Sequence, residues 1–112
     1  MKTLFAVLLA GLAAMAHAAP RAESATECGI AADMAVVARS LAQEEIMQPQ
    51  AGAIMARIYD VSESARGKEL MKDIIDAAYR KNGDSSQKFA EDLFTTCMKD
   101  GGNMDAVLGK AL

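Results

Sequence analysis

Large apolar residues recur every three or four positions along four stretches of the chain, and the first stretch is the longest. It runs from Ser24 to Ile46 and carries one apolar stripe, formed by Ile30, Met34, Val37 and Leu41. A flank of alanines with the same spacing lies beside this stripe, so the apolar side covers about half of the helix circumference. Ser24, followed three residues later by Glu27, fits a capping box, and Thr26 is the alternative cap. We expect a central helix covered by more than one partner.

Three further stretches with the same period predict three more helices. Their expected limits are about Pro49 to Asp60, Ser62 or Ser64 to Lys81, and Asp84 to Gly101. Asp84 with Gln87 is a second candidate capping box. No stretch alternates in the way that is typical of strands. Because the connections are short, the pattern predicts an all-α fold, a small up-and-down four-helix bundle.

The two cysteines lie near opposite ends of this helical region. Cys28 falls in the first turn of the first predicted helix and Cys97 in the last turn of the fourth. In an up-and-down bundle these two ends are neighbours, so we expect a disulfide between Cys28 and Cys97, worth about 4 kcal/mol from loop-closure entropy. Free thiols and intermolecular pairing are the alternatives. The helix pattern and the cysteine positions predict the same topology independently.

The first eighteen residues have the features of a secretory signal peptide. Lys2 is followed by an apolar run at residues 4–16, and Ala16-His17-Ala18 matches a small-x-small cleavage pattern. The run is too short to span a bilayer as a helix. We expect cleavage before Ala19, a periplasmic or secreted protein, and no stable membrane anchoring afterwards; an uncleaved anchoring helix is the alternative. Residues 19–112 then form one helical domain, with about 103–112 as a loose tail.

Charge and histidine content narrow the function classes. The 112-residue chain has a net charge of −3, and loss of Lys2 with the signal peptide changes it to −4. This charge argues against nucleic acid as a partner, since such binding rewards clustered Lys and Arg. Cleavage also removes His17, the only histidine. Histidine-based triads, c-type haem, di-iron and zinc sites are therefore not expected, and we predict no catalytic residue, no metal and no cofactor.

The remaining polar and sulfur-containing residues have ordinary structural interpretations. Three carboxylate pairs are better explained as solvated helix faces than as acid–base or metal sites: Glu44 with Glu45, Asp73 with Asp76, and Glu91 with Asp92. The methionines are interpreted as core filling rather than as a copper site or an adaptable groove. Arg39, at the edge of the apolar arc, is expected to form an ion pair with a neighbouring helix; an anchor for an acidic ligand is the alternative.

The overall pattern resembles a loose group of small exported, uncharacterised proteobacterial helical proteins. The matching features are Cys28 with Ala31, Ala35 and Arg39, then residues 74–79 (IIDAAY), then the segment from Phe89 to Cys97. The resemblance implies an early and a late cysteine on a helical scaffold, and it implies no activity.

These observations favour a small non-enzymatic protein-interaction module, either partner-binding, inhibitory or chaperone-like. A carrier of a small apolar ligand in the bundle core is the alternative, and an enzyme built on carboxylates alone ranks third. The partner is expected to be an unknown protein, and the oligomeric state stays open. The expected contact surface combines Val36 with the tail residues Met104, Val107 and Leu108, which follow a Gly101-Gly102 hinge.

Overall fold

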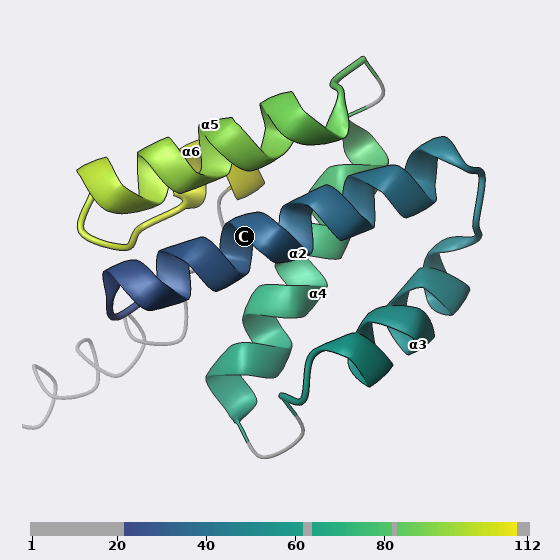
Figure 1. Ribbon diagram of the computed structural model, residues 1–112, viewed down its shortest axis with the longest axis horizontal. Helices are drawn as coiled ribbons and strands as arrows, with labels where there is room; N and C mark the ends of the chain where they lie inside the picture. Colours follow the sequence, from purple (N-terminus) through teal and green to yellow (C-terminus); the bar gives the residue numbers. More distant parts are fainter. Residues whose placement is uncertain (1–21, 62–63, 82, 110–112) are drawn as a thin grey trace, which may run out of the picture.

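A computed structural model describes residues 22–61, 64–81 and 83–109 of the chain (Figure 1). Within these ranges the chain forms helices and no strand, which confirms the all-α prediction. The helices are α2 (Ala25–Gln43), α3 (Gln48–Ile58), α4 (Ala65–Arg80), α5 (Ser86–Lys99) and the short α6 (Asp105–Leu108). None of these helices combines the length and the apolar character that crossing a membrane requires. The predicted signal peptide, residues 1–18, lies outside the described residues.

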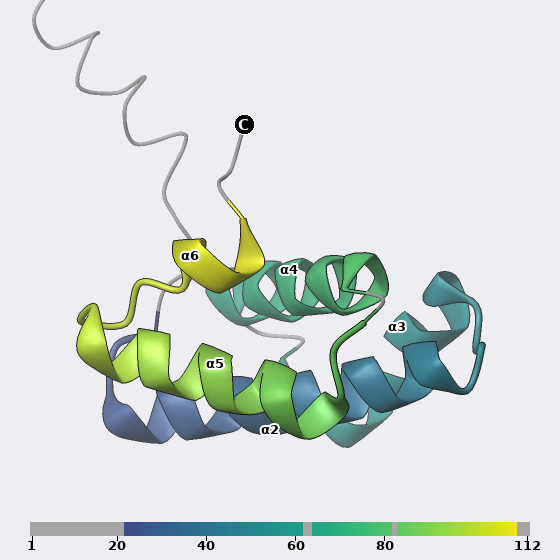
Figure 2. The ribbon, with the colours of Figure 1, turned by 90° about the horizontal axis from the view of Figure 1, so that it is seen from above.

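The four long helices run up and down in sequence order, as predicted, with α2 at the centre (Figure 1). Helix α2 packs against α3, α4 and α5, and α6 packs against α4 and α5. Figure 2 shows two layers: α5 and α2 lie in one layer, and α4 and α6 lie on one side of it. Helix α4 crosses behind α2 at a steep angle instead of lying along it. The opposite side of the α2/α5 layer carries no helix of the described chain.

The first helix begins at a serine cap, as its sequence predicts. The Oγ atom of Ser24 accepts a hydrogen bond of 3.2 Å from the backbone N–H of Glu27. The reciprocal half of the capping box is displaced by one residue, because the Glu27 carboxylate accepts from the backbone N–H of Glu23 at 2.9 Å. Two backbone donors at the start of the helix are satisfied in this way, which fixes the start of α2 close to Cys28.

Serine side chains also cap α4 and α5. Ser64 Oγ accepts from the backbone N–H three residues later at 2.9 Å, which decides between the two predicted caps of this helix. Ser85 Oγ does the same at the start of α5, at 3.0 Å. The predicted Asp84–Gln87 capping box is therefore wrong by one residue. The backbone carbonyl of Asp84 instead accepts hydrogen bonds from side chains of α2.

Helix α2 buries its small-residue flank more deeply than its stripe of large residues. Ala31, Ala35 and Ala38 are fully buried, whereas Ile30 is 45% exposed. Alanine allows neighbouring helices to approach the axis of a central helix closely, and α2 packs against both α4 and α5. Large side chains from these neighbours, including Phe89, then fill the space. The prediction that Ile30 belongs to the buried stripe is wrong for this reason.

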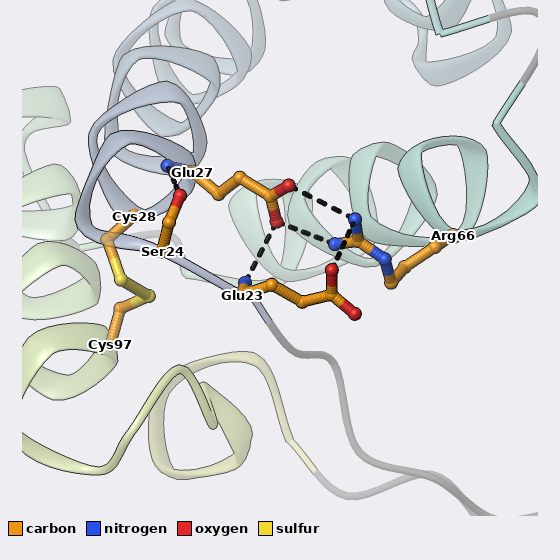
Figure 3. Close-up of a disulfide and its surroundings, with 6 residues drawn as sticks. All are labelled: Glu23, Ser24, Glu27, Cys28, Arg66 and Cys97. Atoms are coloured by element: carbon orange, nitrogen blue, oxygen red, sulfur yellow. Dashed lines mark hydrogen bonds and ion pairs between the residues drawn. A yellow bond between two sulfur atoms is a disulfide. The ribbon is translucent and has the colours of Figure 1, made fainter.

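The predicted disulfide is present and joins the start of α2 to the end of α5 (Figure 3). The Cα atoms of Cys28 and Cys97 lie 5.7 Å apart, and the two residues are 69 positions apart in the sequence. Both residues are buried. The bond therefore closes most of the described chain into one loop and fixes the relative position of α2 and α5.

The segment after α5 is part of the core, so the expectation of a loose tail is wrong. Gly101 and Gly102 have φ angles of 65° and 95°, which non-glycine residues rarely adopt. They turn the chain back so that α6 packs on α4 and α5. Met104 and Leu108 are buried there, and the Arg80 guanidinium donates a 2.8 Å hydrogen bond to the Leu108 carbonyl.

Candidate functional site

The residues of the predicted contact surface fall into two different environments. Val36 is 40% exposed on the outer side of α2. Met104 and Leu108 are buried, and Val107 is half-buried against the core. The predicted surface is therefore wrong for the tail, because the tail apolar residues are needed to cover α4 and α5. Of these four residues, only Val36 is exposed to a partner.

Val36 forms part of an open apolar groove between α2 and α5, called here the α2/α5 groove. Its volume is about 590 Å³, and it is lined by Ala32, Val36, Ser86, Gln87, Ala90, Glu91, Phe94 and Thr95. The two large apolar side chains in this lining, Val36 and Phe94, are each 40% exposed, whereas Ala90 is buried. The groove thus combines small side chains with two large ones that come from antiparallel neighbouring helices.

Phe94 is the residue of this groove that sequence reasoning missed. Its spacing is that of a core residue of the fourth predicted helix, but the core face of α5 is formed by Phe89, Ala90, Leu93 and Cys97. Phe94 instead follows Ala90 by one helical turn and precedes Met98, which is also exposed, by another. A second apolar stripe at the edge of the core face was the available signal.

Polar side chains of α5 form hydrogen bonds and ion pairs along the rim of the groove. The Gln87 side-chain amide donates a 3.1 Å hydrogen bond to Glu91, one turn later. Outside the lining, Lys88 and Asp92 form an exposed ion pair at 3.0 Å with the same spacing. Glu91 and Asp92, the predicted carboxylate pair, thus bind neighbouring side chains on the solvent-exposed face of α5. Glu91 also belongs to the lining of the groove and contributes one acidic group there.

A second apolar cleft, called here the α2/α3 cleft, lies on the other side of α2. Its volume is about 520 Å³, and it is lined by Thr26, Gly29, Ile30, Asp33, Met34, Ile58, Tyr59, Asp60 and Val61. The Tyr59 hydroxyl donates a hydrogen bond to the Asp33 carboxylate. Partial burial, reinforced by this bond, raises the pKa of Tyr59 far above its ordinary value.

The start of α2 is tied to α4 by charged side chains next to the disulfide (Figure 3). The Arg66 guanidinium binds Glu27 through two hydrogen bonds, of 2.6 and 3.1 Å, and approaches Glu23 at 3.5 Å. The hydrogen bonds from Arg66 hold the pKa of Glu27 below its ordinary value, and the backbone N–H of Glu23 adds to this effect. This cluster joins two helix starts and is a structural element.

Arg39 acts inside the fold. It is only 5% exposed, and its guanidinium donates to the backbone carbonyls of Asp84 at 2.9 Å and Ala78 at 2.6 Å. These carbonyls lie in the last turn of α4 and in the connection to α5, where helix carbonyls lack intrahelical partners. Arg39 therefore links α2 to the α4–α5 connection, which leaves the guanidinium inaccessible to an external acidic ligand.

In the described part of the chain, the remaining carboxylate and methionine side chains do not gather at one site. Asp76 accepts hydrogen bonds from Lys72 at 3.0 Å and from Gln48 at 2.5 Å. Partial burial, with the charge of Glu69, raises the pKa of Asp73. Within the described part of the chain, no three His, Cys, Asp or Glu side chains are grouped so that they could hold a metal ion. Most of the methionine side chains predicted to fill the core, Met34 and Met55 among them, are buried or half-buried there, but Met47 and Met98 are exposed.

In comparisons with known protein families, with curated proteins and with solved structures, no match to this chain is found. The resemblance to a group of small exported helical proteins therefore stays a prediction. The functional argument rests on the geometry of the two apolar surfaces beside α2.

Proposed function

We propose that this chain is a non-enzymatic binding module that holds an apolar, helical segment of a protein partner in the α2/α5 groove. The observation that carries the proposal is the exposure of Val36 and Phe94, each 40%, in one groove between antiparallel helices. An isolated exposed apolar residue is ordinary, but two large ones around a shared groove are typical of an interaction site.

The shape of the groove suits a helix. Two small residues of the lining, Ala32 and Ala90, each precede one of the large residues by one helical turn, so a partner backbone can approach α2 and α5 closely. The side of the α2/α5 layer opposite α4 and α6 carries no described helix, which leaves room for a third helix along this layer (Figure 2). An amphipathic helix recognised by a hydrophobic groove is a recurrent mode of protein binding.

We place this activity in the periplasm or outside the cell. The Cys28–Cys97 disulfide supports this location, because disulfides persist in oxidising compartments. The apolar run and cleavage pattern at the start of the sequence support it independently. The net charge of −3 favours a protein partner over nucleic acid.

The carrier and enzyme alternatives have less support. The centre of the bundle is filled by large buried side chains such as Phe89, Met55 and Ile74, so the apolar volume described above lies at the surface. Both cysteines are bonded to each other, and a bonded sulfur is not a thiolate nucleophile. These features favour a protein that binds its partner through a rigid surface over a carrier or an enzyme.

The test compares three forms of the exported protein in affinity capture from a periplasmic extract, quantified by mass spectrometry. The double variant Val36→Ser/Phe94→Ser removes the apolar walls of the groove. The control Ile54→Ser removes an apolar residue of α3 that is 38% exposed and lies outside the groove. We expect one partner captured by the wild type and by the control but lost with the double variant. Equal capture by all three forms contradicts the proposal. Thermal melting of each form checks that the bundle is intact.

A further inference from the structure

We propose that the α2/α3 cleft is a second binding site, and that it takes a basic peptide segment with Asp33 as the counter-ion and Ile30 and Ile58 as the apolar contacts. The occupant is a stretch of a partner protein in which a lysine or arginine stands beside large apolar residues. This inference uses different residues from the α2/α5 groove and does not depend on it.

The apolar part of the cleft comes from two helices. Ile30 of α2 is 45% exposed and Ile58, the last residue of α3, is 55% exposed. Both belong to the lining of one cleft, together with Met34 and Val61. The exposure of Ile30 is unexpected for a residue in the apolar stripe of the central helix. Its burial by a partner would be favourable in proportion to the apolar area removed from water.

The charge of the cleft has one sign. Its charged lining residues are Asp33 and Asp60, and the lining contains no lysine or arginine. Carboxylates beside an apolar surface attract cations and disfavour anionic ligands, and the net charge of −3 adds to this preference. Anionic lipid surfaces and nucleic acids are disfavoured for the same reason. A cationic amphipathic peptide satisfies both parts of the cleft.

Asp33 is held ready for such a ligand. The Tyr59 hydroxyl donates to Oδ2 of Asp33, which fixes the carboxylate of α2 against the end of α3. Asp33 is exposed, and within the described residues its side chain makes no other hydrogen bond. Oδ1 can then accept a charge-assisted hydrogen bond from an ammonium or guanidinium group. A carboxylate fixed in advance loses less conformational entropy on binding than a mobile one.

The experiment measures binding of two labelled synthetic peptides by fluorescence anisotropy. One is a short amphipathic helix of leucine and lysine, and the other has glutamate in place of each lysine. The full exported chain is compared with Asp33→Asn and Ile58→Ser, and with Glu69→Gln, which removes an exposed charge of α4 outside the cleft. We expect the lysine peptide alone to bind, with affinity lowered about tenfold by Asp33→Asn and by Ile58→Ser, and little changed by Glu69→Gln.

Two outcomes overturn the inference. If Asp33→Asn and Glu69→Gln weaken binding equally, the attraction is a general effect of net charge. If Val36→Ser/Phe94→Ser abolishes binding of the lysine peptide and the cleft variants do not, the peptide occupies the α2/α5 groove. That second result would contradict this inference while leaving the proposed function standing. Asp33→Asn preserves the shape of the side chain and an acceptor for Tyr59, so a folding defect is separable by thermal melting.

Discussion

The backbone N–H of Ala22 donates a hydrogen bond of 2.9 Å to the backbone carbonyl of Gly102. This bond joins the segment before α2 to the turn after α5, and it lies beside the disulfide: residues 22 and 102 line the same small surface pocket as Cys28 and Cys97. The disulfide and this backbone hydrogen bond therefore both hold the two ends of the bundle together. The turn that carries α6 depends on the second link.

Substitution of Gly102 tests this link. A Cβ atom added at Gly102 would lie 2.0 Å from the carbonyl oxygen of Ala22, so Gly102→Ala must separate the two segments. We expect a loss of about 3 kcal/mol in the free energy of unfolding, measured by urea denaturation.

The matched control is Gly101→Ala. Gly101 also has a positive φ, 65°, but a Cβ added there meets no atom within 4 Å. Its expected cost is only the strain of the left-handed conformation, about 1 kcal/mol. Equal losses for the two variants would show that the contact between Gly102 and Ala22 is unimportant.

Removal of the disulfide should lower stability without changing the helix content. For the double variant Cys28→Ala/Cys97→Ala we expect a loss of about 4 kcal/mol, because a long loop of the unfolded chain is no longer closed. Denaturation followed by circular dichroism measures this loss. Peptide mapping of the exported protein without reduction should find the two cysteine peptides linked. Alkylation of both cysteines before any reduction would contradict the disulfide.

The C-terminal segment should behave as part of the core. Met104 is fully buried between α6 and its neighbours, so Met104→Ala should cost about 2–5 kcal/mol in unfolding free energy. Val107 is only half-buried, and Val107→Ala should cost clearly less. A protein truncated after Asp100 should be strongly destabilised, since it lacks both the Gly102 link and α6. Unchanged melting of the truncated protein would restore the interpretation of a loose tail.

The pH dependence of stability should show the contribution of Glu27. Arg66 lowers the pKa of Glu27 in the folded protein, so the carboxylate form is favoured by folding. Its stabilisation is present above the pKa of the unfolded chain and is lost as pH falls through the lowered folded pKa. Wild type and Glu27→Gln should therefore differ in melting temperature near neutral pH and converge in acid. A difference that is constant down to low pH would exclude this linkage.

Much of the fold could be predicted from the sequence because local signals agreed with one another. The three-to-four spacing of apolar residues located the four long helices, and the serine caps fixed two of their starts. Cys28 and Cys97 reported independently on topology, since an up-and-down arrangement of four helices brings the first and last ends together. Agreement between local pattern and a long-range constraint is what makes such a prediction secure.

The surface could not be predicted to the same extent, because helical period does not specify which partner covers which side. Ile30 follows the apolar period but is exposed, since the central helix uses its alanines for close contact. Phe94 is exposed because Phe89 and Leu93 already fill the core side of α5. Met104 and Leu108 are buried because the two glycines reverse the chain, an effect that depends on backbone geometry. Each error concerns three-dimensional neighbours rather than local structure.

The most direct test of the central claim is photo-crosslinking in living cells at the α2/α5 groove. A photoreactive benzoylphenylalanine replaces Phe94 in one form of the protein and Ile54 in another; the two side chains have similar exposure, 40% and 38%, and lie on different helices. A docked partner helix predicts a discrete protein adduct from position 94 and none from position 54. Adducts from neither position, or equally from both, would contradict the claim that this groove holds a protein partner.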